Sequence, residues 1–285
     1  MSRRVGSIII RKGVLLAIIL ALSSAASAET SSSQTLRIGI VSSLPIKAAY
    51  EYYSPLLKYM ERKLDRPVEM VLREKQREFD DLLHQGNIAA AFISPQFYMK
   101  NRMKSDLEFL VAPQINGEPY YYTYIIVRKK TEISNIADLR GKRFALGKPE
   151  FALSELAPLS IAGEVNINAE PGKFFSNIQY VQNIQEALYL ITSGQIDGAN
   201  VDSISYNYSI KKKFEHASET TILVKSPRMP APPFVVKRDL ELMTKEKLKE
   251  ILLNMHINLE GKTILNDLGF DKFSAPKISI YNKAK

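Results

Sequence analysis

Two segments of the chain share one pattern without a gap, and this internal echo restricts the fold more than any other feature. Residues 78–98 align with residues 186–206. In each copy a helix-like stretch ends at a glycine, an almost wholly apolar stretch follows, and a polar residue precedes a second helix-like stretch. The two equivalent polar residues are Ser94 and Asp202. The echo therefore predicts two β-α units with equivalent strand ends.

Strand-like and helix-like stretches alternate along most of the chain. The expected helices are residues 48–64, 77–85, 185–193 and 240–253, and the expected strands are residues 36–41, 68–72, 88–93, 120–129, 196–201, 221–225 and 234–236. Such alternation favours a parallel sheet covered by helices. The proline-rich residues 226–233 interrupt the second α/β series, and we expect the chain to return there to the first half of the fold.

The first 28 residues have the pattern of an export signal. Basic residues precede the apolar run 14–22, and Ala26-Ser27-Ala28 supplies the small residues of a cleavage site. A membrane span needs roughly 18 apolar residues, and this run is about half that length, which favours a cleaved signal over the alternative of an uncleaved anchor. The mature protein is therefore expected outside the cytoplasm, in the periplasm.

Composition excludes several functions. The chain has no cysteine, so it cannot carry a lipoprotein anchor, a disulfide, a thiolate zinc site or a cysteine nucleophile. The net charge is +9, but the tight basic run at residues 211–213 is not part of a nucleic-acid motif and is expected to be a solvated face, so we expect no nucleic-acid binding. His84, His216 and His256 lie on different expected elements, without catalytic or metal-ligand spacing. We therefore expect no enzyme, no metal and no cofactor.

The two equivalent strand ends are candidates for a ligand site. Ser94 and Asp202 are favoured helix N-cap residues, and Pro95 suits the first helical position. Ligand crevices of open α/β sheets lie at the carboxyl ends of the strands, and helix N-termini attract anions. We expect Ser94 and Asp202 to face one cleft that holds a small anion, with Asp202 accepting from an amine or hydroxyl of the ligand. The alternative is that both residues only cap their helices.

Five blocks of the sequence together resemble a known family. They are LRIGI (36–40), GNIAAAFISPQFY (86–98), IADLRGK (136–142), GQIDGA (194–199) and LEGKTILNDLGF (259–270). In this order and spacing they resemble the phosphate/phosphite/phosphonate-binding proteins of ABC importers. The resemblance covers essentially the whole mature chain.

This resemblance implies an α/β fold of the two-lobed type 2 periplasmic binding protein class. Mainly parallel sheets flanked by helices are expected, with two hinge crossovers at residues 121–128 and 221–225. The implied division is a signal peptide at 1–28, lobe one at 35–125 and 225–285, and lobe two at 126–224. The lobes are expected to close over the ligand by a hinge motion.

The resemblance also implies a set of ligand-binding residues. The tyrosine of the family's glycine-proline-x-x-tyrosine block falls on Tyr98, with Ser94 in place of the glycine, and the family's acidic residue falls on Asp202. The full expected set is Ser43, Ser94, Tyr98, Ser154, Asn183 and Asp202. The chain departs from the family at residues 148–154, where a loop rich in serine and threonine becomes KPEFALS, and at a family histidine position, which falls on Asn183 or a neighbour within residues 181–184. Burying a dianion without its donors is costly. Either the ligand differs from a phosphonate, or other groups compensate.

The implied partners are a small-molecule ligand and an ABC permease, and the chain is expected to be a monomer. The alternative is that the protein senses a ligand and acts on a membrane sensor. Tyrosines 120, 121, 122 and 124 are expected to pack on both faces of a hinge strand, and the alternative is that they line the cleft.

Overall fold

The computed structural model describes residues 35–73, 76–101, 107–147 and 174–282. The expected export signal, Ser154 and the loop 148–154 beyond Gly147 lie outside the described residues. Within the described ranges, no helix combines the length and the apolar composition that a membrane span requires.

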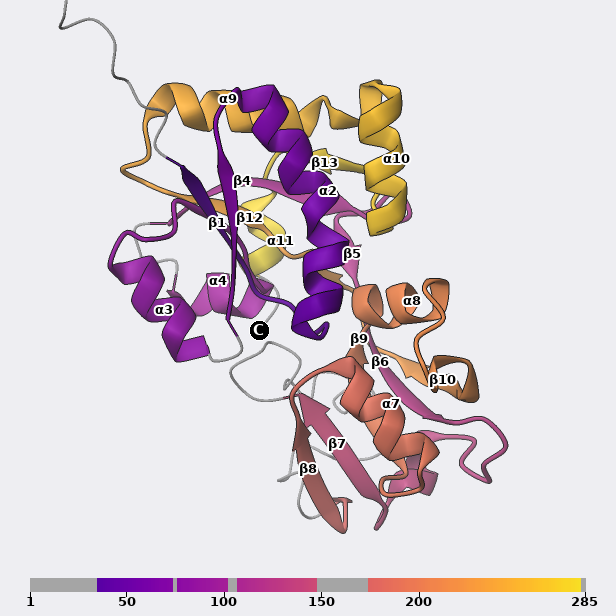
Figure 1. Cartoon of the computed structure of the whole chain (residues 1–285). Helices are drawn as coiled ribbons and strands as arrows, with labels where there is room; N and C mark the ends of the chain where they lie inside the picture. Colours follow the sequence, from indigo (N-terminus) through magenta and orange to yellow (C-terminus); the bar gives the residue numbers. More distant parts are fainter. Residues whose placement is uncertain (1–34, 74–75, 102–106, 148–173, 283–285) are drawn as a thin grey trace, which may run out of the picture. The chain divides into compact units, whose positions relative to one another are not determined.

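The first sheet has six strands in the order β13-β4-β12-β3-β1-β2 (Figure 1). Its strands are β1 (Leu36–Ile40), β2 (Val68–Leu72), β3 (Ala90–Phe92), β4 (Leu107–Gln114), β12 (Phe234–Lys237) and β13 (Lys272–Ser274). Strand β1 pairs in parallel with β2 and β3. Strand β12 returns late in the sequence and pairs antiparallel with both β3 and β4, and β13 extends the antiparallel edge.

Helices cover both faces of the first sheet because its inner strands bury side chains on both sides. The helices are α2 (Ile46–Leu64), α9 (Leu242–Leu253) and α10 (Leu259–Leu268) on one face, and α3 (Gln76–His84), α4 (Pro95–Asn101) and α11 (Ile278–Asn282) on the other. In β3, Ala90 and Phe92 belong to the first of these cores, and Ala91 belongs to the second. This alternation is the two-residue period of a strand.

The second sheet has five strands in the order β10-β6-β9-β7-β8. Its elements are β6 (Thr123–Arg128), β7 (Arg143–Gly147), β8 (Asn177–Val181), β9 (Gly198–Asp202) and β10 (Thr220–Lys225), with α7 (Ile184–Thr192) and α8 (Ser203–Lys211). Short 3-10 helices among the described residues lie at Ile136–Leu139 (η1), Ala217–Glu219 (η3) and Met255–Ile257 (η4). Strand β6 places Tyr124 and Ile126 in the core shared with α7 and α8, and Ile125 and Val127 in a separate core with Phe144.

The chain passes between the two sheets at two adjacent segments. These segments carry β5 (Tyr120–Tyr121) and β11 (Met229–Pro230), which pair antiparallel as a separate two-stranded sheet. Next to them, Thr123 N donates to Ser226 Oγ at 2.9 Å and Ser226 N donates to Thr123 O at 2.8 Å. The expected crossovers 121–128 and 221–225 fall mostly on β6 and β10 of the second sheet, so the crossings themselves lie nearer to β5 and β11.

The two-lobed α/β class expected from the sequence is confirmed, but the sheets are mixed, whereas the sequence pattern predicts mainly parallel ones. The difference arises because β12 inserts antiparallel between β3 and β4, and β6 pairs antiparallel with β9 and β10. The sequence pattern predicts the strand at residues 68–72 with the bounds that β2 has in the structure, but it does not predict β4, β8 or β13. The β-rich stretch 120–129 is divided at Tyr122, whose N–H donates to Ser203 Oγ at 3.1 Å.

The internal echo corresponds to α3-β3-α4 in the first lobe and α7-β9-α8 in the second. Gly86 and Gly194, the equivalent glycines, have φ values of 75° and 73°, a left-handed conformation that ends a helix with little strain in glycine. Ser94 and Asp202 follow the equivalent strands and accept from backbone N–H groups three residues later, at 3.0 Å and 2.7 Å. Both residues therefore cap helices, as their sequence positions predict.

Candidate functional site

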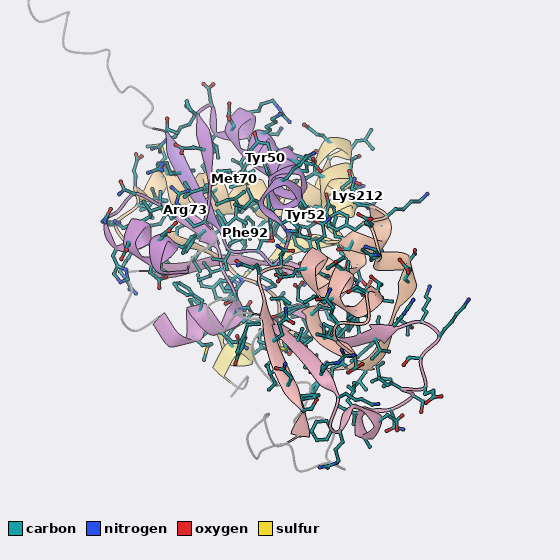
Figure 2. All side chains as sticks on the ribbon, turned by 60° about the horizontal axis from the view of Figure 1, so that its bottom comes forward. Tyr50, Tyr52, Met70, Arg73, Phe92 and Lys212 are labelled. Carbon is teal, nitrogen blue, oxygen red and sulfur yellow. The ribbon has the colours of Figure 1, made fainter. Side chains whose placement is uncertain are left out.

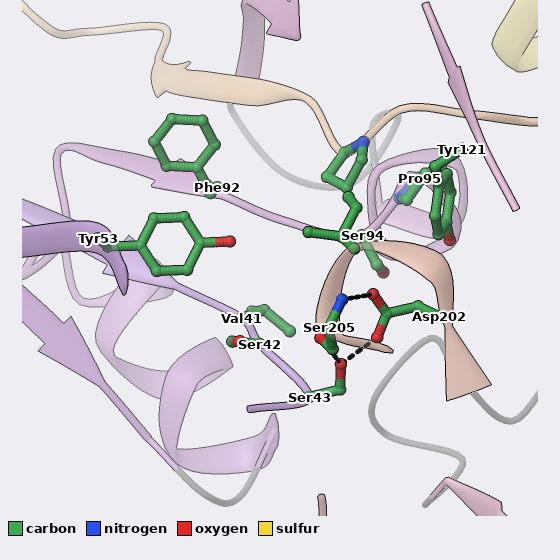
Figure 3. Close-up of a pocket in the computed structure, with 12 residues that line it drawn as sticks. Val41, Ser42, Ser43, Tyr53, Phe92, Ser94, Pro95, Tyr121, Asp202 and Ser205 are labelled. Carbon is green, nitrogen blue, oxygen red and sulfur yellow. Dashed lines mark hydrogen bonds between the residues drawn. The ribbon is translucent and has the colours of Figure 1, made fainter. Parts of the chain in front are cut away.

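A cavity of about 70 Å³ lies at the strand ends where residues of both lobes meet (Figure 3). Its described lining is Val41, Ser42, Ser43, Tyr53, Phe92, Ser94, Pro95, Tyr121, Asp202, Ile204, Ser205 and Pro232. The first-lobe residues come from the ends of β1 and β3, from α2 and from α4, and the second-lobe residues come from the β9–α8 junction. Tyr121 of β5 and Pro232 after β11 belong to the connecting segments. Because a water molecule needs about 10–15 Å³, the cavity has room for roughly five water-sized groups.

Asp202 is buried, and both of its carboxylate oxygens accept hydrogen bonds from the protein. Oδ1 accepts from Ser205 N at 2.7 Å, and Oδ2 accepts from the hydroxyl of Ser43. The Ser43 and Ser205 hydroxyls lie 2.6 Å apart. Since the single hydrogen of Ser43 is given to Asp202, Ser205 is the donor in that pair. The hydroxyl hydrogens of Ser43 and Ser205 are therefore both engaged within the protein.

Ser43 joins the two lobes through its side chain and its backbone. It follows β1 in the first lobe, yet its hydroxyl binds Asp202 at the end of β9. Its carbonyl oxygen accepts from Ile184 N, at the start of α7, at 3.0 Å. The dashed bonds in Figure 3 show that Ser43, Asp202 and Ser205 form one connected group at the edge of the cavity.

Three other hydroxyls of the lining have hydrogens to give. Ser42 Oγ accepts from Leu44 N at 3.1 Å, and Ser94 Oγ accepts from Phe97 N at 3.0 Å, so each keeps its own hydrogen available. The hydroxyl of Tyr53 points into the cavity in Figure 3. Within the described ranges, no acceptor is found for the hydroxyl hydrogen of any of these three residues. The cavity therefore presents free donors to a ligand.

Tyr53 remains a donor over the whole physiological pH range. Burial, and secondly the negative charge of Asp202, raise the pKa of Tyr53 well above its usual value. Tyr53 also contacts Phe92 at 5.7 Å and Tyr52 at 4.7 Å between ring centroids. These contacts fix the direction of its hydroxyl.

The structure brings three of the expected ligand-binding residues together at this cavity: Ser43, Ser94 and Asp202. Asn183 lines an adjoining cavity, where its side chain also caps α7 by accepting from Glu186 N at 3.1 Å. Tyr98 is outside the described lining and packs in the core, with its ring 5.3 Å from Phe109 and 5.8 Å from Tyr281. Ser154 is not among the described residues.

The sequence pattern does not single out three polar residues of the lining, Ser42, Tyr53 and Ser205, and it includes Tyr121 only through the alternative that the clustered tyrosines line the cleft. Ser42 directly precedes Ser43, and Ser205 is three residues after Asp202, the cap of α8. Their nearness in sequence to the expected strand ends is the signal that could have identified them. Tyr53 lies on the buried face of α2, where its ring has the spacing of an ordinary core residue. Of the four clustered tyrosines, Tyr121 lines the cavity, whereas Tyr124 packs against Tyr206 at 5.9 Å.

The adjoining cavity, of about 40 Å³, shares Ser42 with the first one. Its described lining is Ile40, Ser42, Leu44, Pro45, Ile46, Ala49, Leu72, Arg73, Gln182 and Asn183. It also receives residues from both lobes, because Gln182 and Asn183 follow β8 in the second sheet. Among the described residues, no group of three or more histidine, aspartate or glutamate side chains could hold a metal ion.

Two α/β lobes joined by paired connections, with a polar cavity at facing strand ends, define the class of two-lobed periplasmic binding proteins. The family model for "ABC transporter, phosphonate, periplasmic substrate-binding protein" matches residues 38–281. The chain belongs to this family, whose members are periplasmic proteins that bind substrate for transport.

Individual relatives agree with this assignment. The phosphonates-binding periplasmic protein of Escherichia coli strain K12 is 26% identical over 255 residues, which cover 85% of this chain and 72% of the relative. A solved binding component of an ABC phosphonate transporter from Pseudomonas aeruginosa superposes with a TM-score of 0.75 at 21% identity, covering 85% of this chain and 81% of that one. The structure of PhnD1 from Prochlorococcus marinus in complex with methylphosphonate also superposes with a TM-score of 0.75, at 16% identity. The match covers 87% of this chain and 95% of PhnD1. The two structures support the fold.

Proposed function

We propose that this protein captures a phosphonate or a closely related tetrahedral oxyanion in the cavity between its lobes and delivers it to an ABC permease. The observation that carries the proposal is the set of free donors in the cavity. The hydroxyls of Ser42, Ser94 and Tyr53 all retain a hydrogen, while the hydroxyls of Ser43 and Ser205 are used to satisfy Asp202. A site with free donors favours a ligand that is rich in acceptors.

The size of the cavity supports a ligand of this kind. Its volume of about 70 Å³ corresponds to roughly five water-sized groups. Methylphosphonate, the ligand in the Prochlorococcus marinus structure, has five non-hydrogen atoms. The apolar part of the lining includes Phe92, Pro95 and Ile204, which suits the alkyl carbon of an alkylphosphonate. The three free hydroxyls would compensate for the donors that the altered loop 148–154 lacks.

Asp202 restricts which protonation state of the ligand can bind. A buried carboxylate repels an oxyanion unless a proton lies between them. Each carboxylate oxygen can accept a further hydrogen bond beyond the one it already has. Asp202 would therefore accept from a P–OH group of a singly charged ligand, or from an ammonium group of an aminoalkyl ligand.

The localisation and the partners follow from the same proposal. The first 28 residues direct the chain to the periplasm as a cleaved signal, and the mature protein acts as a monomer that meets the permease when its lobes are closed. Mass measurement of the exported protein would show a chain that begins after Ala28, and light scattering would show one copy per particle.

A thermal-shift screen tests the ligand class. At a concentration of 100 Kd a ligand stabilises the folded state by about 2.7 kcal/mol, which for a chain of this size raises Tm by roughly 5–10 °C. We expect such shifts with methylphosphonate, phosphite, phosphate or 2-aminoethylphosphonate, and none with acetate. The proposal is contradicted if every tetrahedral phosphorus oxyanion leaves Tm unchanged at millimolar concentration.

A further inference from the structure

The described lining of the adjoining cavity beside Arg73 carries a positive charge, and the described lining of the first cavity carries none. Arg73 follows directly after β2 of the first lobe, and its side chain is labelled in Figure 2. None of the described residues that line the first cavity is a lysine or an arginine, and its one ionisable carboxylate is Asp202. In the described lining of the adjoining cavity, by contrast, Arg73 is the charged residue. Among the described lining residues, the positive charge therefore lies beside the proposed phosphonate pocket.

The guanidinium of Arg73 keeps most of its hydrogen-bonding capacity. Its Nη1 donates to Leu72 O at 2.7 Å, and within the described part of the chain no carboxylate pairs with it. A guanidinium has five N–H donors in a planar fork that matches the two oxygens of a carboxylate. Arg73 can therefore offer a bidentate contact to an anion while it keeps the bond to Leu72.

Two amide side chains of the second lobe add donors to the same cavity. Asn183 uses Oδ1 to accept from Glu186 N, so its NH₂ group remains available to donate. The side chain of Gln182 makes no hydrogen bond with the described residues. The nearby carboxylate of Glu186 accepts from Gln182 N at 2.7 Å and is not part of the described lining. A guanidinium and two amides from opposite lobes thus line one small space.

We infer that the cavity beside Arg73 is a second binding subsite, which takes the carboxylate arm of a phosphonate that carries one. Ser42 lines both cavities, so a single short ligand can occupy both. The adjoining cavity, of about 40 Å³, has room for roughly three water-sized groups, the size of a carboxylate. The inference rests on the proposed function, because it requires a phosphonate head in the first cavity.

Calorimetric titration with methylphosphonate and phosphonoacetate tests this subsite. The two ligands share the phosphonate head, and only phosphonoacetate has a carboxylate. We expect the wild-type protein to bind phosphonoacetate at least tenfold more tightly. Arg73→Gln should remove most of that preference while it changes methylphosphonate affinity by less than twofold. Gln182→Ala should weaken phosphonoacetate alone, by about twofold to fivefold.

Arg238→Gln is the matched control, because this substitution makes the same change of net charge. Arg238 is exposed and lines neither cavity. It should leave both affinities unchanged. Equal affinities of the two ligands for the wild-type protein would overturn the subsite and leave the proposed function intact. If Arg73→Gln weakened the binding of both ligands equally, Arg73 would only attract anions in general, and the subsite would also be overturned. If neither ligand bound, the proposed function would fail together with the subsite.

Discussion

The carboxylate of Asp202 is bound at both oxygens by groups of the protein itself, and this determines what the residue offers to a ligand. Ser205 N holds Oδ1 as a helix cap, and the Ser43 hydroxyl holds Oδ2 from the other lobe. Asp202 therefore orients Ser43 and Ser205 as well as facing the cavity. Its replacement should affect stability in addition to binding.

Asp202→Asn tests this structural role. An asparagine side chain has a single oxygen, so it cannot accept from both Ser205 N and the Ser43 hydroxyl at their present positions. We expect the free energy of unfolding to fall by about 1–2 kcal/mol, the usual value of a lost cap or of a hydrogen bond to a charged group. Urea denaturation in the absence of ligand measures this change in the free energy of unfolding. Asp81→Asn, at an exposed position of α3, should change stability by less than about 0.5 kcal/mol.

At the scale of single residues, the sequence predicts the strand-end groups and misses those that only packing brings near. Ser94 and Asp202 are visible because the echo repeats strand, polar cap and helix in both lobes. Tyr53 and Arg73 have no such local signal, since one lies within an amphipathic helix and the other after an edge strand. Their position at the cavities depends on how β1, β2 and α2 pack together. Whether Tyr98 contacts the ligand stays a prediction.

At the scale of elements, α10 depends on a glycine at a close backbone approach. A Cβ atom on Gly261 would lie 1.9 Å from the carbonyl oxygen of Met255 in η4. Backbone atoms cannot move aside as a flexible side chain can. Gly261→Ala should therefore shift α10 away from η4 and lower the free energy of unfolding by about 2–4 kcal/mol.

Thermal and urea unfolding of Gly261→Ala would check this, with Thr263→Ala in the same helix as the control. Thr263 is exposed, and its hydroxyl donates only to Leu259 O within the helix. A Gly261→Ala protein as stable as the wild type would show that α10 tolerates a side chain there.

Asp197 ties the beginnings of β7 and β9 together and gives a pH-dependent contribution to stability. Its carboxylate accepts from Arg143 N at 2.8 Å, and from Arg143 Nε and Nη2 at 3.1 Å and 2.9 Å. The hydrogen bonds to the Arg143 side chain lower the pKa of Asp197 below its usual value. The stabilisation is therefore present above the unfolded-state pKa of about 3.9 and is lost as the pH falls through the lowered folded-state pKa.

Asp197→Asn should lower the free energy of unfolding at pH 7 by about 1 kcal/mol, since the pair is partly exposed. The difference from the wild type should shrink below about pH 4. Urea titrations at pH 7 and at pH 3.5 measure both quantities. A difference that is the same at the two pH values would show that the charge of Asp197 does not contribute.

The elements with strong periodicity are predictable, and the strand order is not. The spacing of apolar residues locates α2, α7 and α9 because each buries a regular face. The insertion of β12 between β3 and β4 depends on contacts between residues more than a hundred positions apart. No local pattern contains that information, and mainly parallel sheets are the ordinary expectation for alternating α/β sequences.

At the scale of the whole molecule, the two lobes contact each other next to the cavity and also away from it. Ser43 binds Asp202 and Ile184, and Tyr52 of α2 contacts Tyr208 of α8 with ring centroids 4.7 Å apart. Lys211 of α8 also donates to Asn266 O of α10 at 3.0 Å. A hinge opening at the cavity would break the polar contacts that Ser43 makes with the second lobe.

Ser43→Ala should shift the protein toward an open arrangement. Loss of a hydrogen bond worth about 1 kcal/mol changes the ratio of closed to open molecules by roughly fivefold. We expect a larger radius of gyration without ligand, measured by small-angle X-ray scattering, and recovery of the wild-type value at saturating ligand. Ser54→Ala is the control, because Ser54 lies on α2 away from the first cavity and its hydroxyl donates to Tyr50 O within the same helix. An unchanged radius in the ligand-free variant would show that Ser43 does not influence closure.

The central claim is that free hydroxyls from the first lobe hold an oxyanion in the cavity, and calorimetric titration of methylphosphonate into Tyr53→Phe and Ser94→Ala tests it most directly. Each variant loses one donor, and hydrogen bonds to a charged group contribute about 1.5–3 kcal/mol. We predict that each substitution weakens binding by roughly tenfold to a hundredfold, while the circular dichroism spectrum stays that of the wild type. Binding of methylphosphonate with wild-type affinity by both variants would contradict the account.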